Sequence, residues 1–219
     1  MKKIILYFLL ITSFMISSCE SEQEKKDRLQ KEEQERIELV IEQKEDDLRR
    51  AKQEEQDRIK REAQLEKERQ EKAIYDKYIN NSLRNGSTPY SYCYGGNKRC
   101  SNYGCSEIKV KTPYNSDVLV TIKKSGVVVR HAYIKAGSSY TFEIPNGTYQ
   151  PFFYYGKGWN PEKFMKKTTC GEIKGGFIDD EQFGKDTPQS LSNNILQYEL
   201  ILKKNGNFST KPSNQNEAL

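Results

Sequence analysis

The side chains with the most reactive chemistry in this chain of 219 residues are five cysteines and one histidine. Four of the cysteines could form two disulfides or bind one zinc ion: Cys93, Cys100, Cys105 and Cys170. Structural zinc sites usually draw their thiolates from two C-x2-4-C pairs, whereas the intervals here are six, four and 64 residues. We therefore expect two disulfides, which implies an oxidising compartment.

The four cysteines can pair in three ways. Cys105-Ser-Glu-Ile-Lys and Cys170-Gly-Glu-Ile-Lys begin two similar segments. If these segments form neighbouring strands, their cysteines lie within bonding distance. The similarity favours Cys93–Cys100 together with Cys105–Cys170, and the other two pairings stay open.

The residues needed for catalysis or metal binding are sparse. His131 falls in a segment with strand character, and no Gly-x-Ser-x-Gly nucleophile elbow accompanies it. We expect His131 on the surface of a strand. The acidic cluster from Asp179 to Glu181 lacks the spacing and glycine of a calcium loop, and phosphate-binding and dinucleotide motifs are absent. The sequence therefore predicts no enzyme, no metal and no cofactor.

One aromatic stretch is the best candidate for ligand binding. A run of five aromatic residues between Tyr149 and Tyr155 precedes Gly156-Lys157-Gly158-Trp159-Asn160-Pro161. A tryptophan in a glycine-rich loop, near tyrosine hydroxyls and a lysine, can stack on sugar rings or anchor a protein partner. Tyr155, Lys157 and Trp159 are the predicted recognition residues. The alternative is that these aromatic residues pack in a core.

Charge and aromatic content divide the chain into three segments. Residues 1–18 carry two lysines, residues 20–80 hold 16 basic and 20 acidic side chains, and residues 81–219 hold 18 basic and 11 acidic side chains. Nineteen of the 24 aromatic residues follow position 80. Because only the last segment can build an aromatic-rich core, we expect one globular domain.

Short runs rich in β-branched and aromatic residues alternate with turn signals in this last segment. The predicted strands are Glu107–Lys111, Val118–Lys123, Val127–Ile134, Ser139–Ile144, Thr148–Tyr155, Glu172–Phe177, Leu196–Lys203 and Phe208–Lys211. Asn146-Gly147 and Asn205-Gly206 are strong hairpin signals, and Ser125-Gly126 is a third turn. The pattern predicts a small antiparallel β-sandwich.

The N-terminus has the features of an export signal. Lys2 and Lys3 precede an apolar run of thirteen residues, which is too short to span a bilayer as a helix. Ile16-Ser17-Ser18-Cys19 resembles the lipobox of bacterial lipoproteins, and this resemblance implies cleavage before Cys19 and lipidation of its sulfur. Acidic residues that follow Cys19 are similar to the surface-export signal of Bacteroidota lipoproteins.

Residues 20–80 predict a long charged helix. Thirty-six of these 61 residues are charged, no proline or glycine interrupts them, and many acidic residues lie four positions before basic ones. Ile37, Leu48 and Ile59 are spaced by eleven residues, which gives a sparse apolar stripe. We favour a solvated spacer, with a homo-oligomeric coiled coil as the alternative.

Part of the globular segment resembles a known family. Asp117-Val-Leu-Val-Thr-Ile-Lys, followed by Ser139-Tyr-Thr-Phe-Glu-Ile-Pro-Asn-Gly-Thr-Tyr149, is similar to PEGA and carboxypeptidase-regulatory-like modules. The resemblance covers about 40 residues and implies a non-enzymatic sandwich that is usually appended to envelope proteins. Gly147–Asn160 and Asn205–Ser213 also resemble segments of Bacteroidota lipoproteins, which supplies a location but no activity.

Together these patterns predict an α+β protein in which a charged helix precedes a β-sandwich. The predicted organisation is a signal peptide (1–18), a lipid anchor and rod (19–80), a linker (81–89), the sandwich (90–211) and a disordered tail (212–219). We expect a lipid-anchored envelope protein, at the outer membrane rather than the inner, that binds a glycan or a protein and no nucleic acid. A self-associating structural component is the runner-up, and a hydrolase using His131 is the least favoured alternative.

Overall fold

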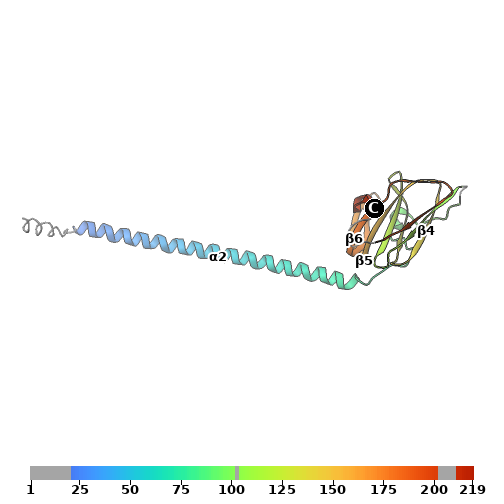
Figure 1. The fold of residues 1–219 in the computed structure, drawn as a ribbon. Helices are drawn as coiled ribbons and strands as arrows, with labels where there is room; N and C mark the ends of the chain where they lie inside the picture. The colour runs from blue at the N-terminus through green and yellow to red at the C-terminus, as the bar shows by residue number, and fades with distance from the viewer. Residues whose placement is uncertain (1–20, 102–103, 202–210) are drawn as a thin grey trace, which may run out of the picture. The chain divides into compact units, whose positions relative to one another are not determined.

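The computed structural model describes residues 21–101, 104–201 and 211–219 of the chain. The fold is α+β, with one long helix and mostly antiparallel sheets (Figure 1). The chain divides into two compact units, residues 1–67 and 68–219. The predicted signal peptide, Cys19 and the Asn205-Gly206 turn lie outside the described residues.

Helix α2 runs without interruption from Glu22 to Tyr78, close to the predicted end at residue 80. Ser21 caps its first turn. The backbone N–H and hydroxyl of Ser21 donate to the Glu24 carboxylate at 2.9 and 3.0 Å, and the Glu24 N–H donates to the Ser21 hydroxyl at 3.2 Å. This capping box satisfies N–H groups that the first turn leaves unpaired, and its hydrogen bonds lower the pKa of Glu24.

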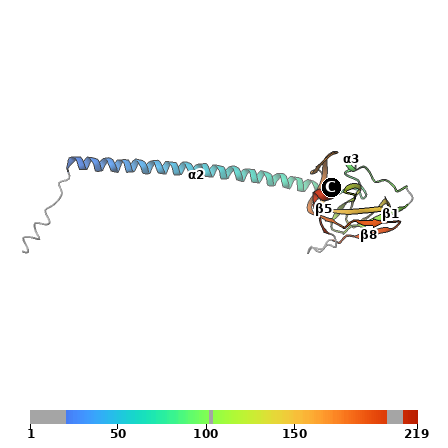
Figure 2. The same cartoon turned by 90° about the horizontal axis from the view of Figure 1, so that it is seen from above.

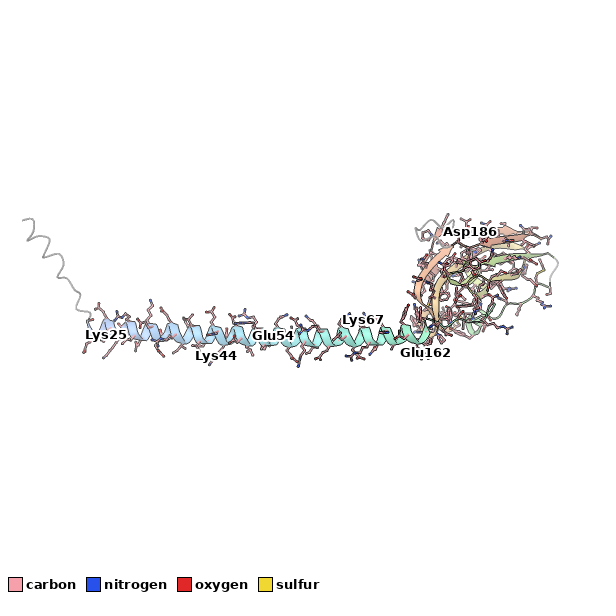
Figure 3. The ribbon with its side chains drawn as sticks, turned by 60° about the horizontal axis from the view of Figure 1, so that its bottom comes forward. Lys25, Lys44, Glu54, Lys67, Glu162 and Asp186 are labelled. Carbon is pink, nitrogen blue, oxygen red and sulfur yellow. A yellow bond between two sulfur atoms is a disulfide. The ribbon has the colours of Figure 1, made fainter. Side chains whose placement is uncertain are left out.

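The surface of α2 is solvated along nearly its whole length, and only its last residue, Tyr78, is buried. Its charged side chains project from the helix, as Lys25, Lys44, Glu54 and Lys67 do in Figure 3. The apolar stripe is 50–56 % exposed at Leu29, Ile37, Val40, Leu48 and Ile59. At about 1.5 Å per residue, the 57 residues of α2 extend about 85 Å.

The described residues of the β domain, which spans 79–219, form two sheets. The first has the order β4-β1-β8 and comprises β1 (Cys105–Lys111), β4 (Ser139–Pro145) and β8 (Ile195–Glu199). β8 runs parallel to β1, and the two lie side by side in Figure 2. This pairing departs from the all-antiparallel arrangement that the sequence predicted.

The second sheet has the order β3-β2-β5-β6-β9 and is antiparallel throughout. Its strands are β2 (Asp117–Lys124), β3 (Val127–Ile134), β5 (Gly147–Thr168), β6 (Gly171–Lys185) and β9 (Lys211–Pro212), and β7 (Gln189–Leu191) pairs with the start of β5. Ser125 and Gly126 both have positive φ, 50° and 80°, so they form the predicted hairpin turn between β2 and β3.

Two apolar cores lie on opposite faces of the second sheet. The first is shared with the other sheet and includes Ile108, Val120, Phe142, Phe153 and Tyr155. The second lies on the other face and includes Tyr90, Leu119, Tyr133, Tyr154, Trp159, Phe177 and Leu219. Because both faces are covered, β2 is buried continuously from Val118 to Ile122.

The hairpin predicted at Asn146-Gly147 is wrong. β4 and β5, which flank it, belong to different sheets, so the chain crosses between the sheets at this point. The Asn146 side-chain oxygen accepts hydrogen bonds from the Ser106 hydroxyl at 2.7 Å and the Asn193 N–H at 2.8 Å. These long-range bonds, which the dipeptide itself does not encode, hold the crossing.

β5 continues well beyond Tyr155, through the segment that was predicted to be a loop. Its pairing with β6 contains irregularities between Tyr155 and Lys157 and between Asn160 and Phe164. Such bulges let a strand accommodate glycine and proline without ending. Trp159 therefore lies in a strand rather than in a loop.

The predicted linker at 81–89 is part of the folded domain. The Gly86 N–H donates to the Tyr133 carbonyl at 2.8 Å, and the Tyr133 N–H donates to the Ser87 carbonyl at 2.7 Å. Farther along β3, the side chain of Asn97 binds both backbone groups of His131, at 2.9 and 3.2 Å. These contacts occupy part of the outer edge of β3.

The prediction of a disordered tail is also wrong. Helix α4 (Gln215–Ala218) and Leu219 pack onto the second core, where Ala218 and Leu219 are buried. The Thr121 hydroxyl donates to the Ala218 carbonyl at 2.6 Å. The polar composition of the tail concealed two apolar residues at its end.

Candidate functional site

The four cysteines form two disulfides, but with a different pairing from the predicted one. Cys93 bonds Cys170, with Cα atoms 5.5 Å apart, and Cys100 bonds Cys105, with Cα atoms 6.0 Å apart. The similarity between the segments after Cys105 and Cys170 misled the prediction, because β1 and β6 belong to different sheets.

The structure does not bring Tyr155, Lys157 and Trp159 together. Tyr155 is 1 % exposed in the first core, and Trp159 is 2 % exposed in the second. Strict alternation would place these two side chains on one face of β5, but the irregularity between Tyr155 and Lys157 shifts the alternation by one residue. Tyr155 and Trp159 therefore face opposite sides of the sheet.

Lys157 lies at the surface, where its Nζ is 2.7 Å from the Asp180 Oδ2. It lines a polar hollow of about 310 Å³ together with Tyr114 and Asp117. The Asp117 carboxylate accepts hydrogen bonds from the Ala136 N–H at 2.7 Å and the Ser82 hydroxyl at 3.0 Å. This carboxylate therefore has a structural role in holding neighbouring segments.

Trp159 is packed among aromatic rings. The rings of Tyr133 and Phe177 meet it edge-on, with centroids 5.4 and 5.3 Å away. Gly175, with φ of 111°, lies beneath the indole, and a Cβ there would be 2.7 Å from Trp159 Cζ2. This packing makes Trp159 a core residue.

Trp159 nevertheless lines an open cleft, here called the Tyr92 cleft. The cleft has a volume of about 730 Å³ and is formed by the segment before β1 together with β5 and β6. Its lining residues are Leu83, Ser87, Thr88, Pro89, Tyr92, Trp159, Pro161, Glu172 and Lys174. It therefore combines apolar side chains with three hydroxyl groups, those of Ser87, Thr88 and Tyr92, and two charges of opposite sign.

Tyr92, in the short helix α3 (Ser91–Tyr94), presents a fixed aromatic ring at this cleft. Its side chain is 56 % exposed. Its hydroxyl donates to the Glu172 carbonyl at 3.2 Å and accepts the Lys174 N–H at 2.9 Å. The hydroxyl thus binds β6 at two alternate backbone positions, as a neighbouring strand would.

A disulfide and an ion pair lie next to Tyr92. The next residue, Cys93, is bonded to Cys170, which directly precedes β6. Glu172 and Lys174 form an ion pair, 3.2 Å between Oε2 and Nζ, and both side chains are about half exposed. An ion pair this exposed adds little stability, so both groups can exchange it for contacts with a ligand.

Sequence reasoning missed Tyr92. Its hydroxyl partners lie 80 and 82 residues away in the chain, so no local pattern reveals them. The available signal was the position of an aromatic residue beside a cysteine that was expected to form a disulfide.

His131 is fully buried, which corrects the prediction of a surface histidine. Its Nε2 accepts the Tyr90 N–H at 3.1 Å, and its ring stacks on that of Tyr90 with centroids 5.9 Å apart. Burial lowers the pKa of His131 to about 4, so the ring is neutral near pH 7. Tyr90 and the α3 segment cover β3 at this position, which a period-two pattern alone does not show.

In the described ranges, 21–101, 104–201 and 211–219, no group of three or more His, Cys, Asp or Glu residues is arranged to hold a metal ion. No helix in these ranges has both the length and the apolar character needed to cross a membrane.

Compared with known proteins, the chain matches no family model, no curated protein and no solved structure. The geometry of the Tyr92 cleft makes it the candidate site, because a half-exposed aromatic ring is held there beside hydroxyl groups and an ion pair.

Proposed function

We propose that this protein is a lipid-anchored component of the cell envelope that displays a β-sandwich binding module on a helical stalk. Cys19 carries the lipid in this proposal, α2 supplies the reach, and the β domain binds a glycan or a protein. The lipobox resemblance supports the anchor, and the acidic residues that follow Cys19 favour the outer membrane. Two disulfides in the β domain suit an oxidising compartment outside the cytosol, and the core shared by both sheets suits a sandwich.

The Tyr92 cleft is the observation that carries the binding function. A half-exposed aromatic ring normally loses side-chain entropy when a ligand orders it. Tyr92 is already held through its hydroxyl by β6 and through its neighbour Cys93 by a disulfide. A cleft that is organised before binding keeps more of its contact energy as affinity.

A binding screen with purified protein tests this proposal. The probes are a glycan array and solubilised envelope fractions, and the variants are Tyr92→Ala and Tyr114→Ala. Tyr114 is an exposed tyrosine in the separate polar hollow, so it is the matched control. We expect Tyr92→Ala to weaken binding by about 10-fold or more and Tyr114→Ala to leave it unchanged.

Trp159→Ala is unsuitable for this screen because the indole is a core residue. Equal binding by wild type and Tyr92→Ala would contradict a role for the cleft. Circular dichroism of each variant shows whether the domain is still folded, so that lost binding and lost structure are separated.

The half-exposed apolar stripe of α2 favours a second function, a structural component that self-associates through the helix. Leu29, Ile37, Val40, Leu48 and Ile59 are separated by eight, three, eight and eleven residues, which suits a sparse coiled-coil seam. Sedimentation of the purified protein distinguishes the two functions. A stable oligomer favours the structural role, and a monomer favours display.

A further inference from the structure

We propose that the Tyr92 cleft binds one pyranose ring of an uncharged glycan, with the ring stacked on Tyr92. This inference rests on the proposed binding function and specifies its ligand. The size of the cleft is the first argument. At about 730 Å³, it falls within the range of about 300–1,000 Å³ that is usual for small-molecule sites. A protein partner would instead need a broad surface of about 800 Å².

The aromatic platform is the second argument. The face of an aromatic ring carries partial negative charge, and the C–H groups on one face of a pyranose carry partial positive charge. Tyr92 lines the cleft with a side chain that is 56 % exposed, and its hydroxyl is engaged by the backbone of Glu172 and Lys174 in β6. Because the ring is held at that end, it stays in place for a sugar to stack on.

The polar groups around the cleft are the third argument. The side chains of Ser87, Thr88 and Glu172 line it beside the apolar surfaces of Pro89 and Pro161. Hydroxyl and carboxylate groups are the partners that sugar hydroxyls take for hydrogen bonds. This mixture of an apolar wall and hydroxyl-binding groups suits a pyranose, which has both kinds of surface.

Charge is the fourth argument, and it selects among glycans. Residues 81–219 carry a net charge of +7, which by itself would favour a polyanion. The cleft does not share this excess, since its one acidic residue, Glu172, and its one basic residue, Lys174, form an ion pair. The cleft is therefore neutral, and a sugar without phosphate or carboxylate groups fits it best.

Trp159 makes the proposal directly measurable, because it is the one tryptophan of the chain and lines the cleft. The purified full chain is titrated with the methyl pyranosides of glucose, galactose and mannose and with their neutral hexasaccharides, while indole fluorescence is followed. We expect a saturable change with at least one of these sugars. We also expect its affinity to be the same at 50 and 500 mM NaCl, because salt screens interactions between charges.

Three variants test the stacking geometry. Tyr92→Ala removes the platform and should weaken sugar binding by about 10-fold or more. Tyr92→Phe keeps the ring but removes the two hydrogen bonds to β6, and should weaken binding by about 2- to 5-fold. Tyr114→Ala should bind as wild type does. Equal affinities for Tyr92→Ala and wild type would overturn the proposal.

Two other outcomes separate this proposal from the function on which it rests. If no neutral sugar changes the fluorescence, but an envelope fraction binds in a Tyr92-dependent way, the sugar assignment is overturned and the binding function stands. If heparin, used as a polyanionic probe, binds through Tyr92 with strong salt dependence, an anionic ligand replaces the neutral one. If neither sugars nor envelope fractions depend on Tyr92, both proposals fail.

Discussion

Apolar side chains are largely exposed in helix α2 and buried in the core of the β domain. Leu48 in α2 is 56 % exposed, whereas Ile108 in the β domain is fully buried. The hydrogen bonds within α2 join residues three or four positions apart, as in its capping box. In the β domain the hydroxyl of Tyr90 reaches the carbonyl of Gly175, 85 residues away. Local bonds stabilise α2 turn by turn, and long-range contacts stabilise the β domain as a unit.

The largest expected difference comes from removing a large side chain in each region. Trp159→Ala should lower the free energy of unfolding of the β domain by about 3–5 kcal/mol, because the indole fills the second core. Leu48→Ala in α2 should change the free energy of unfolding by less than about 0.5 kcal/mol, since that side chain is largely solvated. Urea unfolding followed by near-ultraviolet circular dichroism of the tyrosines measures both. Similar changes in the free energy of unfolding for Trp159→Ala and Leu48→Ala would contradict the difference between the two regions.

The two disulfides of the β domain should differ in how much they stabilise it. Cys93–Cys170 closes a loop of 77 residues and Cys100–Cys105 one of five. From the loop entropy of the unfolded chain, replacing the first pair by serine should cost about 4.5 kcal/mol and the second about 2 kcal/mol. The helical signal of α2 should persist in both variants. Peptide mapping without reductant checks the pairing, and a peptide joining Cys105 to Cys170 would contradict it.

Acid should destabilise the β domain through His131. Its pKa is about 4 in the folded protein, below the ordinary value of 6.5. The unfolded chain therefore takes up the proton first as the pH falls, so stability is full above pH 6.5 and declines toward pH 4. Between pH 7.5 and 5 the loss should be about 2 kcal/mol.

His131→Gln provides the control for this pH dependence. Its amide oxygen can accept the Tyr90 N–H as His131 Nε2 does, but it does not titrate. Urea unfolding at several pH values should therefore show a flatter profile for the variant. An unchanged slope would assign the pH dependence to other groups.

The strands were predictable where local chemistry decides them. Val127–Ile134 is a strand with the predicted bounds, and β2 differs from its prediction by one residue at each end. β-branched residues and the Ser125-Gly126 turn, which encode these strands, are local signals. Asn146-Gly147 is also local, but which sheet the next strand joins depends on partners far along the chain.

The candidate site was predictable only in part. The sequence indicated Trp159, which does line the cleft, but a bulge placed it in the core and separated it from Tyr155. Tyr92 could not be found, because its position depends on β6 and on the pairing of Cys93. Local sequence patterns therefore indicated the region of the cleft through Trp159 but did not indicate Tyr92.

The occupied edge of β3 has a consequence for a protein that is tethered as proposed. Molecules confined to a membrane meet each other at high effective concentration, where unpaired strand edges can join neighbouring molecules. On β3, the backbone of Gly86 and Ser87 binds Tyr133, and the amide of Asn97 binds His131. Along this stretch, the strand edge is already paired, so that neighbouring copies on one membrane do not form intermolecular β-sheets through it.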